Sequence, residues 1–228
     1  PQHEEDADGA SKGLKYVSDE QLYDDKRSEA WKDMLVPGAC GINVTVEQKQ
    51  YGPGGQPEMC IKISRVRWDR MYWDPHSSEP DFSDAAYLGL VTWMDLDEAL
   101  RLYGKEGREA LETTMDAAPS DTYDDKPKFN LWADRKRKRV RVCQEWLKRG
   151  EEYHFAEFTK GGILKAGPSP FQDDKGQSDT ALFFQSAYVD RDNNRYGLVR
   201  TLVPLQEEIN KRRSKALHLL NTAQVVME

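Results

Sequence analysis

The longest periodic pattern of apolar positions lies near the end of the chain and predicts an amphipathic helix over residues 201–221. With Leu205 as the origin and a turn of about 100° per residue, the apolar side chains gather on one side of this helix. They are Leu202, Leu205, Ile209, Ala216, Leu219 and Leu220. Because an apolar stripe on a helix needs an apolar partner, we expect this helix to pack against another element or another molecule.

The polar part of the same helix divides into two different faces. Opposite the stripe lie Glu207, Lys211, Lys215 and His218. The pairs Glu207 with Lys211 and Glu208 with Arg212 have the favourable i,i+4 order, worth about 0.2–0.5 kcal/mol each. Between this charged face and the stripe runs an uncharged strip that both donates and accepts hydrogen bonds. The strip consists of Gln206, Asn210 and Ser214. Such a strip suits contact with a second copy of the helix, so these three residues are candidates for a subunit contact.

Shorter patterns before this helix predict a mixed order of helices and antiparallel hairpins. Helical spacing of apolar residues predicts a first helix that begins with a capping box of Ser18 and Gln21 and ends near Pro37, and two further helices over residues 95–104 and 106–115. Alternating apolar and polar residues predict strands at 42–46, 61–66, 68–73, 139–147, 153–158 and 182–189. A turn is expected at 52–55, an exposed loop at 117–128, and residues 161–177 are rich in Gly and Pro. This order predicts an α+β fold with mainly antiparallel pairing.

Composition limits the possible partners. The 228 residues carry a net charge of −7, so the chain as a whole does not attract phosphate and non-specific DNA affinity is not expected. Six Trp and ten Tyr argue against a disordered chain. Three cysteines without CxxC spacing (Cys40, Cys60 and Cys143) indicate a reducing compartment rather than a disulfide framework. No apolar stretch is long enough for a membrane span and no signal peptide is seen, so no membrane partner is expected.

The most basic segment combines arginines with the start of a predicted strand. It contains Arg135, Arg137, Arg139 and Arg141. Alternate arginines on a strand are typical of a solvated sheet edge, where they block unwanted pairing. The alternative is a contact with an acidic neighbouring subunit, for example through residues 121–125, or with DNA.

Carboxylates between residues 69 and 84 raise the question of a metal site. Asp69, Asp74, Asp81 and Asp84 lie near His76, but their spacing matches no ligand loop and Asp beside Pro or at a turn is ordinary turn chemistry. Asp81 together with residues 124–126 is a weak match to the Asp…Asp-x-Lys pattern of metal-dependent nucleases. One alternative is that Cys143 and His154 meet across a hairpin, but a buried Cys beside a strand histidine more often serves packing. There is no phosphate-binding loop. We therefore expect no catalytic residue, no metal and no cofactor.

Two segments carry a resemblance to a known family. The segment RYGLVRTLVPLQEEINKRRSKALHLLN (195–221) resembles the start of the stem in portal proteins of tailed double-stranded DNA bacteriophages, especially the short-tailed type. The segment RMYWDPHSSEPDFSDAAYLGLVTWMDLDEALRLYG (70–104) resembles part of their wing domain, and RVRVCQEWL (139–147) fits a wing strand between the two. The acidic, non-periodic start of the chain indicates a terminal or linker segment at 1–15. The resemblance implies a wing at 16–200, the first stem helix at 201–221 and the start of the clip at 222–228.

The resemblance also implies a function. Portal proteins form a ring, dodecameric in the family, at one vertex of the virion capsid, where DNA is packaged and ejected without catalysis by the portal itself. The implied partners are other copies of the chain, terminase, capsid and scaffolding proteins, and tail or head-completion proteins. Double-stranded DNA is expected to pass through the ring without sequence-specific contacts. Since the chain begins without Met and stops in a β-like run, we expect a piece of a longer protein, without the second stem helix or crown. The alternatives are a metal-dependent nuclease domain and a generic protein-binding adaptor.

Overall fold

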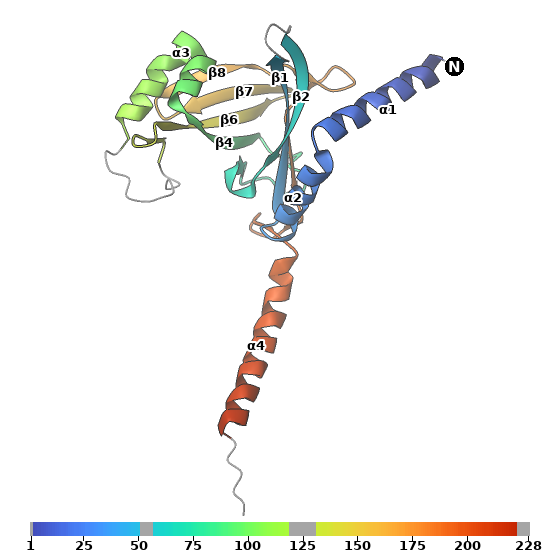
Figure 1. The fold of residues 1–228 in the computed structure, drawn as a ribbon, viewed down its shortest axis with the longest axis vertical. Coiled ribbons are helices and arrows are strands. Elements are labelled where there is room, and N and C mark those ends of the chain that lie inside the picture. The colour runs from blue at the N-terminus through green and yellow to red at the C-terminus, as the bar shows by residue number, and fades with distance from the viewer. Residues whose placement is uncertain (1, 51–56, 119–130, 223–228) are drawn as a thin grey trace, which may run out of the picture.

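Two antiparallel sheets form the body of the protein, and helices α1 and α4 project from it (Figure 1). The computed structural model describes residues 2–50, 57–118 and 131–222. A three-stranded sheet has the order β11-β1-β2, built from Leu182–Ser186, Ala39–Gln50 and Pro57–Val66. A larger sheet has the order β3-β4-β6-β7-β8, with β5 paired to β6. Its strands are Met71–Trp73, Tyr87–Asp95, Arg139–Arg149, Glu152–Thr159, Gly162–Pro168 and Ala133–Asp134. The predicted α+β class with antiparallel pairing is confirmed.

The main hydrophobic core lies between the two sheets. Leu182 and Phe184 on β11 and Leu88 and Leu90 on β4 are buried there, together with Trp146 on β6. The loop between β3 and β4 closes this core with Phe82, whose ring packs against Trp73 and Phe184. Because the loop is part of the core, its backbone is fixed in place rather than free on the surface.

Helix α3 (Leu96–Asp116) builds a second core on the larger sheet. Leu111 of the helix and Val140 and Val142 of β6 are fully buried in it. Gly104 has φ 59° and ψ −141°, which interrupts the helix between its two predicted parts. Both predicted helices and the break at Gly104 are therefore confirmed. Glycine adopts this backbone conformation at little steric cost.

Helix α2 (Tyr23–Leu35) covers the outer edge of β2. Lys26 Nζ donates to the carbonyl of Ile63 (2.6 Å), and Arg65 donates to Asp33 through Nε (2.9 Å) and Nη2 (2.7 Å). These side chains occupy the strand edge, which would otherwise be open to pairing with another chain. The hairpin of β1 and β2 follows the prediction, while its turn at 52–55 lies outside the described residues.

Several predicted boundaries are wrong. Residues 2–20 form helix α1, whereas a terminal or linker segment was predicted at 1–15. Ser18 therefore lies inside a helix and is no cap, and Leu22, at φ 49°, precedes α2. Residues 68–73 do not extend the first hairpin, because β3 pairs with β4 in the other sheet. Strands β4 and β8 were not predicted. Their pairing depends on neighbours distant in sequence, which local periodicity does not reveal.

Helix α4 (Val199–Thr222) confirms the predicted long helix and starts two residues earlier. Pro204 therefore lies in the second turn of the helix. A proline there removes one backbone hydrogen bond. Since the surrounding residues are exposed, the carbonyl that loses this bond lies where water is accessible.

Candidate subunit interface

Helix α4 extends away from both sheets, and none of its residues is buried (Figure 1). The predicted apolar stripe is exposed along its length. Its large side chains, Leu202, Leu205, Ile209, Leu219 and Leu220, have exposed fractions between 51% and 73%. An exposed stripe of this length is unusual for a soluble helix and marks a surface that contacts something else.

The polar faces of α4 have the predicted arrangement. Lys211 Nζ lies 3.7 Å from Glu207 Oε2 on the charged face, and Arg212 pairs with Glu208 along one side of the stripe, so both predicted i,i+4 pairs are present. On the amide strip, Gln206 Nε2 donates to Asn210 Oδ1 at 3.0 Å. This bond fixes the two carboxamides relative to each other while both side chains stay exposed. The strip is thus preorganised to exchange further hydrogen bonds with a partner.

Arg195 fixes the base of α4 to the loop between β3 and β4. It lies on β13 (Arg195–Tyr196), which pairs with β12 (Tyr188–Val189) just before the helix. Its Nη1 donates to the carbonyl of Ser77 (3.1 Å), and its Nη2 donates to Ser77 Oγ (3.0 Å) and to the carbonyl of Glu79 (3.1 Å). The guanidinium also lies over the ring of Phe82, 4.6 Å from its centroid. One side chain therefore joins the helix base to the main core.

Asp84 orders the same loop from its other end. It accepts hydrogen bonds from Ser77 Oγ (2.6 Å) and from the backbone N–H of Ser78 (2.7 Å). Burial opposes its ionised form, but these bonds outweigh burial and lower the pKa of Asp84 to about 2. Asp74 likewise accepts the N–H groups of His76 (2.9 Å) and Ala86 (3.1 Å), and these two bonds are the main reason its pKa is lowered. This is the turn chemistry that the sequence predicted for these carboxylates.

Two glycines allow the backbone of the helix base to touch the end of α2. A Cβ on Gly197 would overlap the carbonyl oxygen of Leu35, and a Cβ on Gly38 would overlap the backbone of Tyr196. Gly38 also has φ 98°, a conformation that favours glycine. Arg200 adds an ion pair to Asp190, with Nη1 3.4 Å from Oδ2. The direction of α4 is therefore set both by the close backbone contacts at Gly38 and Gly197 and by the Arg200–Asp190 ion pair.

The basic segment does not lie on a sheet edge, and that prediction is wrong. Arg139 and Arg141 lie on β6, which is flanked there by β4 and β5, and Arg135 and Arg137 lie in the exposed turn between β5 and β6. All four side chains contact other groups of the chain. Arg135 Nε donates to the carbonyl of Met115 at the end of α3 (3.0 Å), and Arg137 pairs with the buried Asp134 (2.9 Å). Arg139 pairs with Asp95 (3.0 Å), and Arg141 lies over the ring of Trp132 (5.1 Å). A role of these arginines toward a subunit or DNA stays a prediction.

The remaining candidates for chemistry are not brought together. Cys143 faces Phe158 and His154 faces Leu147 across β6 and β7, so the alternative in which Cys143 meets His154 does not hold. Residues 124–126, half of the nuclease pattern, lie outside the described residues. Over residues 2–50, 57–118 and 131–222, no group of three His, Cys, Asp or Glu side chains is placed to hold a metal ion. Over the same residues, no helix is both long and apolar enough to cross a membrane.

Comparison with known protein families identifies the family of this chain. A family model of phage P22-like portal proteins matches residues 1–228, the whole chain. The chain belongs to the family of phage P22-like portal proteins. The family is structural and non-enzymatic, and its members are components of the capsid vertex of the virion. No curated protein matches the chain.

Within the portal family assignment, the structure adds a feature that sequence reasoning missed. The amphipathic pattern identified α4, but it did not identify Arg195 as the residue that fixes its base. The available signal was the pair Tyr196–Gly197 directly before a helix, since glycine at such a place often marks a close backbone approach.

Proposed function

We propose that this portal protein assembles into a ring, a dodecamer as in its family, through α4. This proposal is supported by the apolar stripe and the amide strip of α4, both of which are exposed, and by the attachment of the helix base to the loop between β3 and β4. In a ring each helix has a neighbour on either side, so two different faces are used by every copy. The stripe and the strip of Gln206, Asn210 and Ser214 are two such faces.

The energetics favour a closed ring over an isolated helix pair. Full burial of one Leu or Ile side chain contributes about 1.5–3 kcal/mol, while association of two molecules costs about 4–15 kcal/mol. Five large apolar side chains along the stripe offset a cost of that size. Because closing a ring adds one interface without a further association step, closure stabilises every copy.

In this proposal the ring is a passive conduit for double-stranded DNA during packaging and ejection. The net charge of −7 and the engagement of Arg135, Arg137, Arg139 and Arg141 within the chain support weak contact with phosphate. Terminase, capsid and scaffolding proteins, and tail or head-completion proteins are the docking partners we infer from the family. The chain acts without catalysis, without a cofactor and within the virion.

The test is the oligomeric state measured by native mass spectrometry. Replacement of two stripe residues, Leu205→Glu with Ile209→Glu, is expected to abolish oligomers, because the charges would be buried unpaired in the interface. The matched control places two new carboxylates on the charged face, Lys215→Glu with His218→Glu, and is expected to keep them. Equal oligomer populations in both variants would contradict the role of the stripe.

A further inference from the structure

Strand β4 has a free edge over its second half. Strand β3 pairs with it along Leu88–Leu90 and no further, because the chain before Met71 forms the short 3₁₀ helix η1 (Trp68–Arg70) instead of a longer strand. Along Val91–Asp95, no strand of the described residues pairs with β4 on this side. The larger sheet therefore ends here in an unpaired strand segment.

The backbone groups of this segment point to the free side. The carbonyl of Tyr87 faces β3, since it accepts the N–H of Asp74 at 3.1 Å. Backbone groups alternate between the two sides of a strand, so those of Val91 and Trp93 are directed to the same side as those of Tyr87. An added strand would find donors and acceptors there.

The other end of the same sheet is protected against such pairing. Strand β8 carries Lys165 and Pro168, and its register with β7 shifts between Glu157 and Phe158. Lysine, proline and bulges are the features that keep a strand edge from pairing with another chain. The free segment of β4 begins instead with Val91–Trp93, three residues that favour strands. Of the two edges, the one at β4 is thus suited to accept a strand.

Two pockets meet at this free edge. The first, of about 550 Å³, is lined by Val91 and Trp93 of β4 and, on the hairpin of β1 and β2, by Asn43, Thr45 and Ser64. The second, of about 540 Å³, shares Arg70 and Val91 with the first. Its aromatic lining residues are Trp68, Tyr72, Trp132 and Phe158. We call them the polar pocket and the aromatic pocket.

The two pockets lie on opposite faces of the sheet. Residues that face each other on neighbouring strands share one face, so Val91, Cys143 and Phe158 lie on one side. Leu90 and Gln144 lie on the other side. The aromatic pocket contains the first three residues, and the polar pocket contains the last two. A strand added beside β4 would therefore direct alternate side chains into the two pockets.

Arg70 selects the charge of such a strand. The cations that line the polar pocket are Lys62, Arg65, Arg67, Arg70 and Arg139. Four of them pair with acids of the same chain and contribute little net charge. The guanidinium of the partly buried Arg70 has no ion pair and no hydrogen bond among the described residues. A carboxylate from a partner would give it a charge-assisted hydrogen bond.

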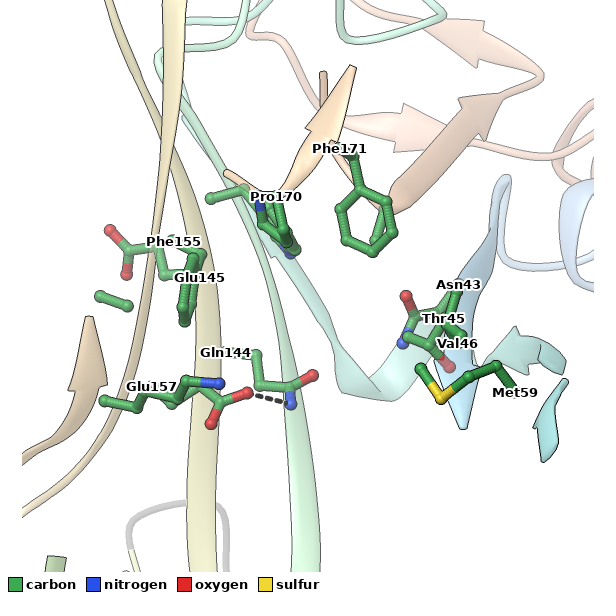
Figure 2. A pocket seen from close by; sticks show the side chains of 14 residues that line it. Asn43, Thr45, Val46, Met59, Gln144, Glu145, Phe155, Glu157, Pro170 and Phe171 are labelled. Atoms are coloured by element: carbon green, nitrogen blue, oxygen red, sulfur yellow. Dashed lines mark hydrogen bonds between the residues drawn. The ribbon is translucent and has the colours of Figure 1, made fainter. Parts of the chain in front are cut away.

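A third pocket, of about 570 Å³, continues the polar pocket toward β7 (Figure 2). The two share Asn43, Thr45 and Gln144. Its charged lining residues are Glu145, Glu157 and Lys165. Gln144 Nε2 donates to Glu157 Oε1 (2.7 Å), and Tyr72 donates its hydroxyl proton to Glu145 Oε2 (3.2 Å). Since both carboxylates already have partners within the chain, the selection of charge lies at Arg70.

We propose that the free edge of β4 binds an extended segment of a partner protein in which acidic and apolar side chains alternate. The backbone of this segment pairs with Val91 and Trp93. One acidic side chain reaches Arg70 in the polar pocket, and apolar side chains pack against Trp68 and Tyr72 in the aromatic pocket. The partner is a polypeptide rather than DNA, because a strand edge is matched by backbone N–H and C=O groups. All of these residues belong to one chain, so the site does not depend on the proposed ring.

The probe is a synthetic peptide with blocked ends and the sequence Thr-Val-Glu-Val-Glu-Val-Glu-Val-Thr, and fluorescence anisotropy measures its binding to the whole chain. Arg70→Glu is expected to weaken binding by about tenfold or more, because a carboxylate then meets a carboxylate. The matched control, Arg108→Glu on the exposed face of α3, makes the same change in net charge and should leave the affinity unaltered. A peptide with Lys in place of Glu should bind the Arg70→Glu chain more tightly than the natural one. Absence of binding at millimolar peptide, or an equal loss in both variants, would overturn the proposal.

Pairing through the backbone has a signature of its own. Two further peptides carry N-methyl groups on alternate residues, in one peptide on the odd positions and in the other on the even positions. One set of N–H groups faces β4 and the other faces away, so one peptide should lose binding by about tenfold or more while the other stays within about twofold of the parent. Equal behaviour of the two would contradict strand addition. Displacement of the parent peptide by a short duplex DNA at similar concentration would assign Arg70 to phosphate and also overturn it.

The stripe variant Leu205→Glu with Ile209→Glu separates this inference from the ring. It should bind the parent peptide as the natural chain does. If it forms no oligomers and also fails to bind the peptide, the site is not complete in one chain and this inference is wrong, while assembly through α4 stands. If peptide binding follows the expectations above but the stripe variant assembles like its control, this inference stands and assembly through α4 is wrong.

Discussion

Arg195 and Ser77, which are 118 positions apart in the sequence, share two hydrogen bonds: Nη1 with the Ser77 carbonyl and Nη2 with Ser77 Oγ. Ser77 in turn donates its hydroxyl proton to Asp84 at 2.6 Å. This short chain of contacts connects the base of α4 to a loop whose Phe82 lies in the main core. A helix that stands free in solvent is thus held at one end by a partly buried, charge-assisted network.

Removal of Arg195 should weaken the whole fold. Arg195→Ala is expected to lower the free energy of unfolding by about 2–4 kcal/mol, because the carbonyls of Ser77 and Glu79 lose a charged donor. Arg195→Lys should recover less than half of this, since one ammonium does not reproduce the fork. Urea unfolding measures both. Arg191→Ala, an exposed arginine in the adjacent turn, is the control and should change little.

The close approach of α2 to the base of α4 predicts a strong effect at Gly197. Gly197→Ala should lower the melting temperature markedly, because the new methyl group would overlap the carbonyl of Leu35. Gly13→Ala in α1, where a Cβ meets nothing, should instead be neutral or stabilise by up to about 1 kcal/mol. Thermal unfolding followed by circular dichroism compares them. Equal melting temperatures would show that the backbone contact is not required.

Acid should loosen the loop of Asp84. Its folded pKa of about 2 lies below the ordinary value of 3.8, so its contribution to stability is complete above about pH 4 and disappears as the pH falls toward 2. Asp84→Asn should therefore reduce stability at neutral pH and make it less dependent on pH between 4 and 2. Chemical unfolding at several pH values tests this. Glu106→Gln, on the exposed face of α3, should leave the pH profile unaltered.

The amide strip predicts a specific effect on assembly. Asn210→Leu removes the acceptor of Gln206 Nε2 and widens the apolar surface, so the ring size or the yield of rings should change. Asn210→Gln, which keeps an amide, should disturb the ring less. Native mass spectrometry of both variants decides the matter, and an unaltered ring population in Asn210→Leu would refute a role of the strip.

DNA affinity should be weak and nearly independent of the basic segment. We expect a dissociation constant of about 10⁻⁴ M or weaker for duplex DNA at physiological salt. Replacing Arg135 and Arg139 with Ala should barely change it, since both are engaged within the chain. Each phosphate neutralised adds roughly 0.9 to the slope of log affinity against log salt. Micromolar binding with a slope reduced by about two in the variant would identify a DNA-contacting segment.

The sequence by itself determined the elements whose signal is local. The stripe of α4, the break at Gly104 between two short helices, and the alternation in β1, β2 and β6 follow from residues within one or two turns or along one strand. Such patterns record which face of an element is apolar, and that property does not depend on which partner covers it.

Only the tertiary structure decided which elements meet. It placed β6 in the centre of a sheet rather than at its edge, paired β3 with β4, and brought Arg195 to Ser77. It also showed that residues 2–20 are helical, which their acidic and weakly apolar composition did not indicate. Strand partners and buried ion networks depend on contacts between residues far apart in the chain. A local pattern contains no information on those contacts, because the same alternation suits an edge strand and a central one.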